Sequence, residues 1–442
     1  FFQSNQMSFA LSSRCLSAAR YLPSLTRGQS LAWPHMPLKA ENKEGSHRPQ
    51  GGAGLTSGPP PCAGASSYSS GRRSFSSIAT SAAGPAIAAA ALTFTPGHAA
   101  LGGAILGVAT VGNLLLNGRV LGISGAVKGL VQGDRAAWRT ALLAGMILAA
   151  IPAASFFPAA FDVLPASFSA RAAVGGLLVG LGATMGNGCT SGHGICGNAR
   201  LSPRSLAYTM TFMAAGAAAA TLTDTLGALG VPAITPQYVP IPVPELQTGL
   251  AIAGVAAAAA AALAFAGRSM SNGSAKSALE MGSSFAFGSV FSMGLLISGM
   301  CHPSKVAAFL SPLSPAWDLS LMFVMGSAVG LSFPAFQSVL GKLWQTPSWA
   351  ASPAITPAYC LPPSSGPGAK IDARLITGGL LFGAGWGLSG MCPGPAIVAA
   401  AATGSTPVLA YLAAVVAGVA VEPLLTKAWT AVSSNSTPKA VN

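Results

Sequence analysis

Charged side chains are scarce in this 442-residue chain, and their scarcity decides its class. Asp, Glu, Lys and Arg together make up 7% of the residues, whereas hydrophobic residues make up 51%. A soluble domain carries roughly 25% charged residues, which it needs to cover its surface. A surface that faces lipid needs almost none, so the composition predicts an integral membrane protein with several spans.

Signatures of nucleotide and nucleic-acid binding are absent from the sequence as well. The chain has no P-loop, Rossmann fingerprint, HExxH or GxSxG motif, so coupling to ATP within this chain is not predicted. Its formal net charge is +13, but the basic residues form no face interleaved with aromatics. The composition therefore gives no support for a nucleic acid partner.

The first 80 residues differ in character from the rest of the chain. No acidic residue precedes Glu41, and the segment from Met7 is rich in Ser, Arg and Ala. Arg14 and Arg20 fit one side of a short amphipathic helix, which is typical of an organelle transit peptide. We therefore interpret 1–80 as a transit peptide or a disordered extension. The expected location is the mitochondrial inner membrane, with the plastid envelope or the plasma membrane as alternatives.

Long apolar stretches fill the remainder of the chain. About nine of them approach the length of 20 residues that crosses a bilayer. They cover 98–117, 138–157, 171–187, 205–226, 247–267, 281–300, 316–337, 374–391 and 405–426. Loops after the odd-numbered stretches hold twelve Lys and Arg residues, whereas loops after the even-numbered ones hold only Lys305, with two Arg residues at span edges. Because positive charge collects on one side of a membrane, this asymmetry supports the order of the spans.

Four segments with a common pattern divide these spans into two groups. Each segment starts with glycines along an apolar helix and ends in a polar turn that contains glycine. The segments are 102–129, 175–197, 288–305 and 378–396. The fifth span lies between the second segment and the third. The first two segments are therefore expected to run through the membrane in the direction opposite to the last two.

The sequence thus predicts an all-α integral membrane protein with two four-span halves of inverted topology. The expected order is a first half at 98–226, a connecting span with its loops at 227–280, a second half at 281–426, and a C-terminal tail at 427–442. Inverted repeats with broken helices are typical of transporters, where irregular backbone from both halves meets near the midplane. Lipid cannot satisfy free peptide groups, so these turns are expected to line a cavity inside the protein.

Three cysteines occupy the same place in three of the four segments. Cys189 lies in NGCTSG, Cys301 in SGMCHP and Cys392 in SGMCPGP, and alignment of the SG pairs puts Val127 there in the first segment. Glycine-rich turns ahead of helix N-termini expose N–H groups that bind anions. Thiols and hydroxyls add soft and hydrogen-bonding contacts, which suit a small anion that contains sulphur. The predicted pathway residues are Cys189, Thr190, Ser191, Gly192, His193, Cys301, His302, Ser389, Gly390 and Cys392.

Other chemistry remains open for these turns. Cys189, His193 and Cys196 offer three ligands for zinc, but their spacing matches no standard zinc motif and leaves Cys392 unused. A disulfide between Cys189 and Cys196 suits only an oxidising space. Cys189 could also act as the nucleophile of a membrane enzyme that relays sulphur as a persulphide. The roles of Cys196 and of the loop 338–373 stay open.

Two motifs in these segments match a known family. The run GCTSGHGI with GGLLVGLGA before it, and GLSGMCPGP with GGLLFGAG before it, resemble the YeeE/YedE family of sulphur-transport membrane proteins. The resemblance extends over 98–426 and includes both halves. It implies uptake of thiosulphate, or of a related reduced-sulphur species, through a short pore with cysteines reaching in from both faces. By this resemblance Cys189 and Cys392 contact the passing ion, and Cys301 is a third candidate.

Our prediction from the sequence is therefore a transporter or channel-like permease and not an enzyme. The expected partners are a small sulphur-containing anion and the lipid bilayer, together with an unidentified sulphur-handling protein; no cofactor or metal is predicted. Four ionisable groups lie near the ends of spans, where we expect them to reach the interface: Asp224, Glu280, Asp318 and Glu422. Without a buried acid to carry protons, channel-like passage is expected rather than proton coupling.

Overall fold

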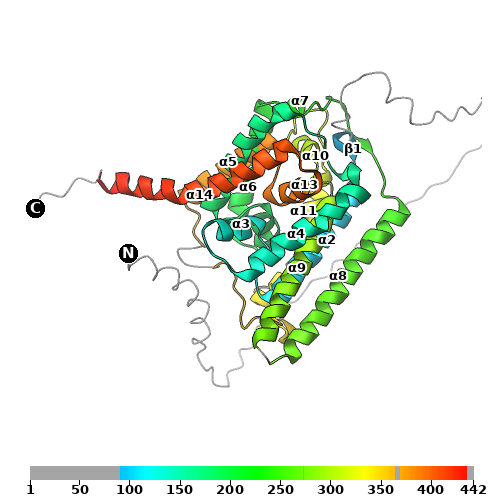
Figure 1. The fold of residues 1–442 in the computed structure, drawn as a ribbon, viewed down its shortest axis with the longest axis vertical. Helices are drawn as coiled ribbons and strands as arrows, with labels where there is room; N and C mark the ends of the chain where they lie inside the picture. The colour runs from blue at the N-terminus through cyan, green and yellow to red at the C-terminus, as the bar shows by residue number, and fades with distance from the viewer. Residues whose placement is uncertain (1–89, 272, 364–368, 436–442) are drawn as a thin grey trace, which may run out of the picture. The chain divides into compact units, whose positions relative to one another are not determined.

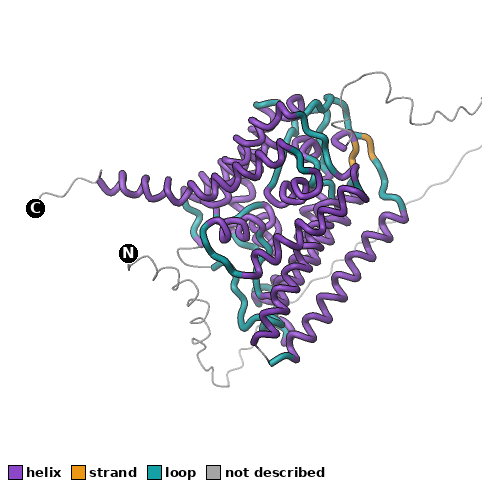
Figure 2. Tube along the Cα trace, viewed as in Figure 1, coloured by secondary structure: helices purple, strands orange, loops and turns teal. Residues whose placement is uncertain are grey.

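Helices account for nearly all of the regular structure of this chain (Figure 1). The computed structural model describes three stretches: residues 90–271, 273–363 and 369–435. The predicted transit peptide at 1–80 lies outside the described residues, as do the last residues of the predicted tail, 436–442. Within those three stretches the strands are β1 (Thr93–Phe94) and β2 (Gln237–Tyr238), which form one short parallel pair (Figure 2).

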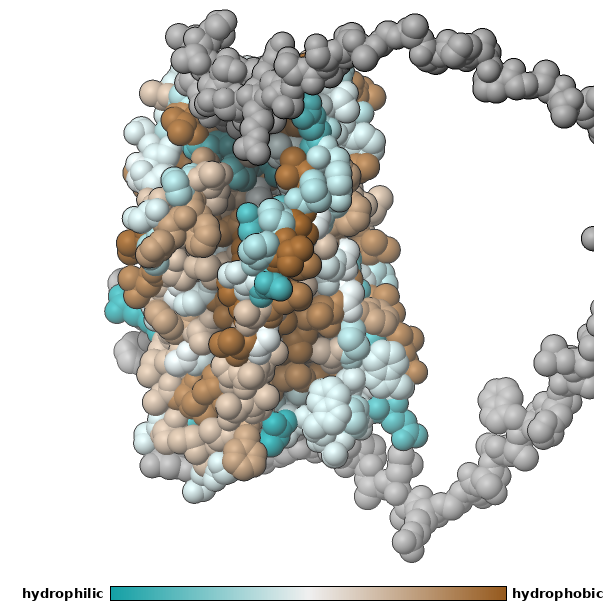
Figure 3. Space-filling model, turned by 90° about the vertical axis from the view of Figure 1, so that its right-hand side faces the viewer, coloured by the Kyte–Doolittle hydropathy of each residue, from teal (hydrophilic) through white to brown (hydrophobic). Residues whose placement is uncertain are grey.

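Nine spans in the described residues are long and apolar enough to cross a membrane. They are α2 (Pro96–Asn117), α4 (Ala137–Phe156), α5 (Ser169–Gly186), α6 (Pro203–Leu222), α8 (Val243–Ser269), α9 (Gly273–Ile297), α11 (Ser320–Leu340), α12 (Ala373–Ser389) together with the shorter α13 (Pro393–Thr403), and α14 (Thr406–Asn435). Their number and order match the prediction, so the all-α membrane fold is confirmed. Hydrophobic and near-neutral residues cover most of the described surface visible in Figure 3, as contact with lipid requires.

Four short helices interrupt the sequence of long ones. They are α3 (Ile123–Val131) between α2 and α4, the π-helix η5 (Thr190–Gly197) between α5 and α6, α10 (Pro303–Phe309) between α9 and α11, and α13 between α12 and α14. Each of the four repeated segments contains one of these breaks. The other short elements are η2 (Ala90–Leu92), η3 (Pro158–Ala160), η4 (Ala166–Phe168), α7 (Thr225–Ala228) and η6 (Ser348–Ala350).

The four breaks share one backbone feature. Each contains a residue in the left-handed conformation, with φ between 63° and 76°: Gly118, Asn187, Gly299 and Gly390. Gly and Asn reach this conformation at the least cost, which explains these residue types at the ends of the long helices. The three aligned cysteines each follow such a residue by two positions. In the first segment that position is Val120, whereas Val127 lies inside α3, so the alignment that put Val127 at the turn is wrong.

Helices α5 and α12 run antiparallel and in close contact. A Cβ on Gly182 would lie 2.3 Å from the Phe382 amide nitrogen, and one on Gly385 would lie 2.4 Å from the Gly175 carbonyl oxygen. The first part of α5 thus lies beside the last part of α12. Glycine allows this close approach of two backbones, as is usual between membrane helices. The turns that follow α5 and α12 therefore start at opposite ends of the pair.

Contacts between the long helices follow a repeated pattern. Helix α2 packs against α9 and α11, and α9 packs against α2 and α4. Likewise α5 packs against α12 and α14, and α12 packs against α5 and α6. Exchange of α2 with α9, α4 with α11, α5 with α12 and α6 with α14 leaves this set of pairs unchanged. Helix α8 has no counterpart in the exchange, and it packs mainly against α2 at the edge of the bundle (Figure 1).

Candidate functional site

Cys189 and Cys392 occupy equivalent backbone positions. Each has an extended backbone, with φ of −128° and −113°, and each stands immediately before a short helix, η5 or α13. Both thiols are buried. Because α5 and α12 run antiparallel, the two cysteine turns enter the bundle from opposite ends.

One cavity, here called the central cavity, is lined by both of these cysteines. Its lining comes from the breaks and from α2, α9 and α11, and consists of Leu106, Ile123, Cys189, Thr190, Ser191, Ile195, Phe291, Leu295, Met300, Val324, Met325, Cys392, Gly394 and Pro395. Three helices begin at this cavity, because Ile123, Thr190 and Gly394 lie in the first turns of α3, η5 and α13. The N-terminus of a helix carries a partial positive charge. The lining contains no Lys or Arg side chain.

Hydroxyl groups connect the cysteine turns in the central cavity. Thr190 Oγ1 lies 3.0 Å from Cys392 Sγ, and Ser191 Oγ lies 3.3 Å from Cys189 Sγ. Ser191 Oγ also accepts a hydrogen bond of 3.3 Å from the amide of Ile123, the first residue of α3. Three of the four breaks therefore meet through thiol, hydroxyl and amide groups within otherwise apolar walls.

Cys301 lies in a neighbouring cavity, here called the Cys301 cavity. Its lining residues are Phe161, Asp162, Leu164, Met300, Cys301, Pro303, Gly390, Met391, Pro395, Ala396, Ala399, Thr403 and Val408. Met300 and Pro395 line both cavities, so the two are adjacent. The third predicted cysteine is thus placed next to the first two, but not in the same cavity.

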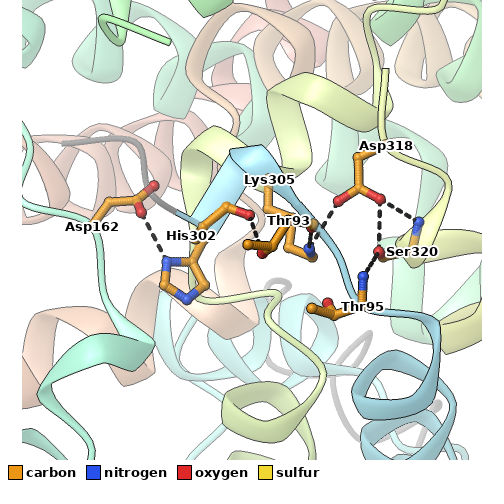
Figure 4. A network of polar contacts seen from close by, with 8 residues as sticks. Thr93, Thr95, Asp162, His302, Lys305, Asp318 and Ser320 are labelled. Carbon is orange, nitrogen blue, oxygen red and sulfur yellow. Dashed lines mark hydrogen bonds and ion pairs between the residues drawn. The ribbon is translucent and has the colours of Figure 1, made fainter. Parts of the chain in front are cut away.

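Asp162 holds the start of helix α10 beside the Cys301 cavity (Figure 4). Its Oδ1 lies 2.8 Å from His302 Nδ1, and its Oδ2 accepts a hydrogen bond of 2.8 Å from the Ser304 amide. The Asp162 side chain is only 3% exposed. Asp162 follows η3 and precedes α5, so this contact joins the α4–α5 loop to α10.

A second ion pair holds α10 from another direction. Lys305 Nζ lies 2.8 Å from Asp318 Oδ2 and donates a hydrogen bond of 2.6 Å to the Thr93 carbonyl oxygen (Figure 4). Asp318 Oδ1 accepts a hydrogen bond of 2.8 Å from the Ser320 amide at the start of α11. The position of α10 is therefore fixed relative to β1 and α11.

Two of the carboxylates that we expected at the membrane interface are buried. Asp318 is 1% exposed and Glu422 is 3% exposed, and Glu422 forms an ion pair with Arg374. The expectation is wrong for these two residues, and so is the premise that the chain has no buried acid. Sequence reasoning also missed Asp162 as a buried acid, because its position among turn residues indicated a loop. The only signal in the sequence was that Asp162 and Lys305 belong to loops on the same side.

His193 faces away from the central cavity. Its Nε2 lies 3.1 Å from the Gly186 carbonyl oxygen, and its Nδ1 lies 3.0 Å from Ser205 Oγ. A carbonyl oxygen can only accept, so Nε2 donates to Gly186. The ring also packs 4.4 Å from that of Tyr208. These partners fasten η5 to α5 and α6.

The remaining predicted residues shape the turns. Ser389 donates a hydrogen bond of 2.7 Å to the Gly385 carbonyl oxygen within α12. Gly390 lines the Cys301 cavity, whereas Gly192 and His302 line neither of the two cavities. The structure thus brings Cys189, Thr190, Ser191 and Cys392 together in the central cavity, and it places Cys301 and Gly390 in the adjacent Cys301 cavity.

The geometry does not support a pathway role for Cys196, and it supports neither the disulfide nor the zinc site. The Cys196 thiol lies 3.6 Å from the Leu121 carbonyl oxygen, outside both cavities, and Cys189 and Cys196 are free thiols, so the disulfide alternative is wrong. Within the described parts of the chain, no group of three His, Cys, Asp or Glu residues is arranged to hold a metal ion. The proposed ligand set of Cys189, His193 and Cys196 therefore has no geometric support there.

Comparisons with known proteins find a family match in each half of the chain. Residues 71–219 match a family described as sulphur transport, and residues 279–432 match one described as a family of unknown function (DUF6691). A "Probable transporter" of Xylella fastidiosa strain Temecula1 is 48% identical over 125 residues, which cover 27% of this chain and 90% of the relative. A "Probable transporter" of strain 9a5c is 41% identical over 135 residues, which cover 30% of this chain and 82% of the relative. No solved structure matches the chain.

The spanning helices and the relatives together define a membrane transporter. The chain covers 90% of a relative at 48% identity and matches the sulphur transport family over residues 71–219. It therefore belongs to the YeeE/YedE family of sulphur-transport proteins, and the resemblance carried by the cysteine motifs is confirmed.

Proposed function

We propose that this protein is a permease for thiosulphate or for a related small anion that contains sulphur. The observation that carries the proposal is the meeting of Cys189 and Cys392 in the central cavity, although their turns start at opposite ends of α5 and α12. A permease needs a site near the middle of the membrane at which residues from both faces meet.

An inverted repeat would explain this meeting. The symmetric set of helix contacts supports the equivalence of the first half, 98–226, and the second half, 281–426, with α8 as the extra span that reverses direction. The Xylella relatives support two units, since each matches less than a third of this chain but 82% to 90% of its own length. By this proposal Cys189 and Cys392 are equivalent residues of the two units.

The chemistry of the central cavity suits an anion with a polarizable sulphur atom. The oxygens of thiosulphate can accept hydrogen bonds from Thr190 and Ser191 and face the N-termini of α3, η5 and α13. Its terminal sulphur can face the thiols of Cys189 and Cys392, which are soft, weak donors. Without a Lys or Arg in the lining the anion is held weakly enough to leave, which permeation requires.

The composition of residues 1–80 supports a proposal for the membrane that holds this permease. Their Ser- and Arg-rich composition favours an organelle address, and we propose the mitochondrial inner membrane. A fluorescent protein fused to the C-terminus tests this location. Fluorescence in the plastid envelope or the plasma membrane would reject the mitochondrial location.

Uptake by reconstituted vesicles tests the permease. We expect vesicles with the full chain to accumulate radiolabelled thiosulphate with its sulphur–sulphur bond intact. The variants Cys189→Ala and Cys392→Ala should slow uptake about tenfold, as a barrier raised by ~1.4 kcal/mol predicts. Cys196→Ala is the matched control, since Cys196 lies on η5, the helix that follows Cys189, and its thiol is outside both cavities.

Two outcomes would reject different parts of the proposal. Normal uptake by the Cys189→Ala, Cys392→Ala double variant would reject the pathway role of the cysteines and leave the permease standing. Release of sulphite, together with a persulphide on Cys189 in the mass spectrum, would instead indicate the sulphur-relay enzyme.

A further inference from the structure

The linings of the central cavity and the Cys301 cavity share two residues, Met300 and Pro395, here called the partition. Pro395 is a buried ring in the first turn of α13. Met300 is only half-buried, and its unbranched side chain has three rotatable bonds. The partition between the cavities thus has one rigid component and one component that can move.

The backbone that carries Met300 is tied down. The Met300 amide donates a hydrogen bond of 3.2 Å to the Leu295 carbonyl oxygen, and the preceding Gly299 has a left-handed φ of 76°. Two residues after Met300, His302 is held by Asp162, and Lys305 is held by Asp318 (Figure 4). These contacts hold the backbone around Met300, whereas its side chain keeps its rotatable bonds.

We propose that Met300 is the gate of the pathway: its side chain closes the passage between the Cys301 cavity and the central cavity, and its rotation admits a small sulphur-containing anion. This inference rests on the proposed function and adds the residue that controls passage. The thioether suits the task, because a hydrophobic constriction blocks water and ions when closed. Rotamer changes of such side chains are fast compared with transport.

The gate also orders the sulphur atoms along the route. An anion in the Cys301 cavity meets the Cys301 thiol first, then the Met300 thioether at the partition, and then the Cys392 and Cys189 thiols in the central cavity. Every contact offered to its terminal sulphur is polarizable. Anions that bind through hard oxygen contacts alone lack this series of partners.

Labelling of the native cysteines tests the gate. The full chain is reconstituted in sealed vesicles, and a membrane-impermeant methanethiosulphonate reagent is added outside. Mass spectrometry measures the rate at which each cysteine is labelled in protein whose α9 and α12 have their C-terminal ends on the outside of the vesicle. We expect Met300→Ala to speed the labelling of Cys392 and Cys189 about tenfold, as removal of a barrier of ~1.4 kcal/mol predicts.

Two other methionines provide matched controls. Met325 lines only the central cavity, and Met391 lines only the Cys301 cavity. Met325→Ala and Met391→Ala enlarge one cavity without removing the partition, so each should speed the labelling of Cys392 less than Met300→Ala does. An unchanged rate in Met300→Ala, or an equal increase in all three variants, overturns the gate.

A second variant covers the case in which Met300→Ala does not fold. Met300→Leu keeps a similar volume but is branched and less flexible, so we expect slower thiosulphate flux with the inner cysteines still shielded. Wild-type flux in Met300→Leu overturns the gate. If labelling responds as expected but wild-type vesicles take up no thiosulphate, the gate stands and the proposed solute is rejected.

Discussion

The Thr190 hydroxyl oxygen lies 3.0 Å from the Cys392 sulphur, although the two residues are 202 positions apart and belong to different halves of the chain. Both residues are buried, so each side chain serves the other in place of water. The contact joins the start of η5 to the start of α13. It therefore couples the two turns that carry the proposed pathway cysteines.

Removal of this hydroxyl should weaken transport without unfolding the protein. Thr190→Val keeps the shape of the side chain but loses the hydrogen bond to Cys392 and one donor for the anion. We expect the KM for thiosulphate uptake to rise about fivefold, since a net hydrogen bond contributes ~1 kcal/mol. Thr211→Val is the control, because the Thr211 hydroxyl bonds the Ala207 carbonyl oxygen of its own helix. Equal KM values in the two variants contradict the role of Thr190.

Loss of one partner of the buried Lys305–Asp318 pair should destabilise the fold strongly. Asp318→Asn removes the carboxylate that pairs with the buried Lys305 ammonium. Breaking a buried pair in this way costs about 3 to 5 kcal/mol, which thermal unfolding in detergent measures. The surface pair of Arg139 and Asp134 is the control, and Asp134→Asn should cost less than ~1 kcal/mol. Similar decreases in unfolding temperature for the two variants would show that water reaches the Lys305 ammonium.

Much of this architecture was predictable from residue patterns. Apolar runs gave the spans, because a bilayer fixes their length, and the bias of Lys and Arg gave their order. The approach of Cys189 to Cys392 was expected from the inverted direction of the repeated segments, and the two residues line one cavity. What these patterns have in common is a physical constraint imposed by the membrane itself.

Details within the breaks were not predictable in the same way. His193 lies two residues after Ser191, yet it turns toward Ser205 and Gly186 while Ser191 lines the cavity. The π-helical winding of η5 sets which side each residue faces, and no periodicity shows in an eight-residue helix. The burial of Asp162 likewise depends on a partner 140 positions away, His302. Such contacts between distant segments leave no local pattern.

Glycine packing between α5 and α12 should limit substitution sharply. A Cβ on Gly182 would lie 2.3 Å from the Phe382 amide nitrogen, which is backbone and cannot move aside easily. We expect Gly182→Ala to lower stability by about 1 to 3 kcal/mol, the usual cost of overpacking, measured as a shift in the unfolding midpoint. Gly254 on α8 has nothing within 4 Å of its Cβ position, so Gly254→Ala should not destabilise the protein. Equal shifts would mean that the two helices separate without cost.

The turn before Cys392 offers a prediction that separates backbone strain from crowding. Gly390 and Gly404 are both left-handed, with φ of 65° and 61°, so alanine at either position costs about 1 to 2 kcal/mol in strain. Only at Gly390 is there also a clash, since its Cβ would lie 2.4 Å from the Pro303 carbonyl oxygen, whereas nothing lies within 4 Å at Gly404.

Pro303 begins α10, so this clash would push the Cys392 turn away from the turn that carries Met300 and Cys301. We therefore expect Gly390→Ala to lose stability beyond the strain term and to slow thiosulphate uptake, while Gly404→Ala loses only the strain term and keeps its uptake rate. Thermal unfolding and vesicle uptake measure both effects in the same preparations. Equal losses in the two variants would show that the Cys392 and Cys301 turns are not packed against each other.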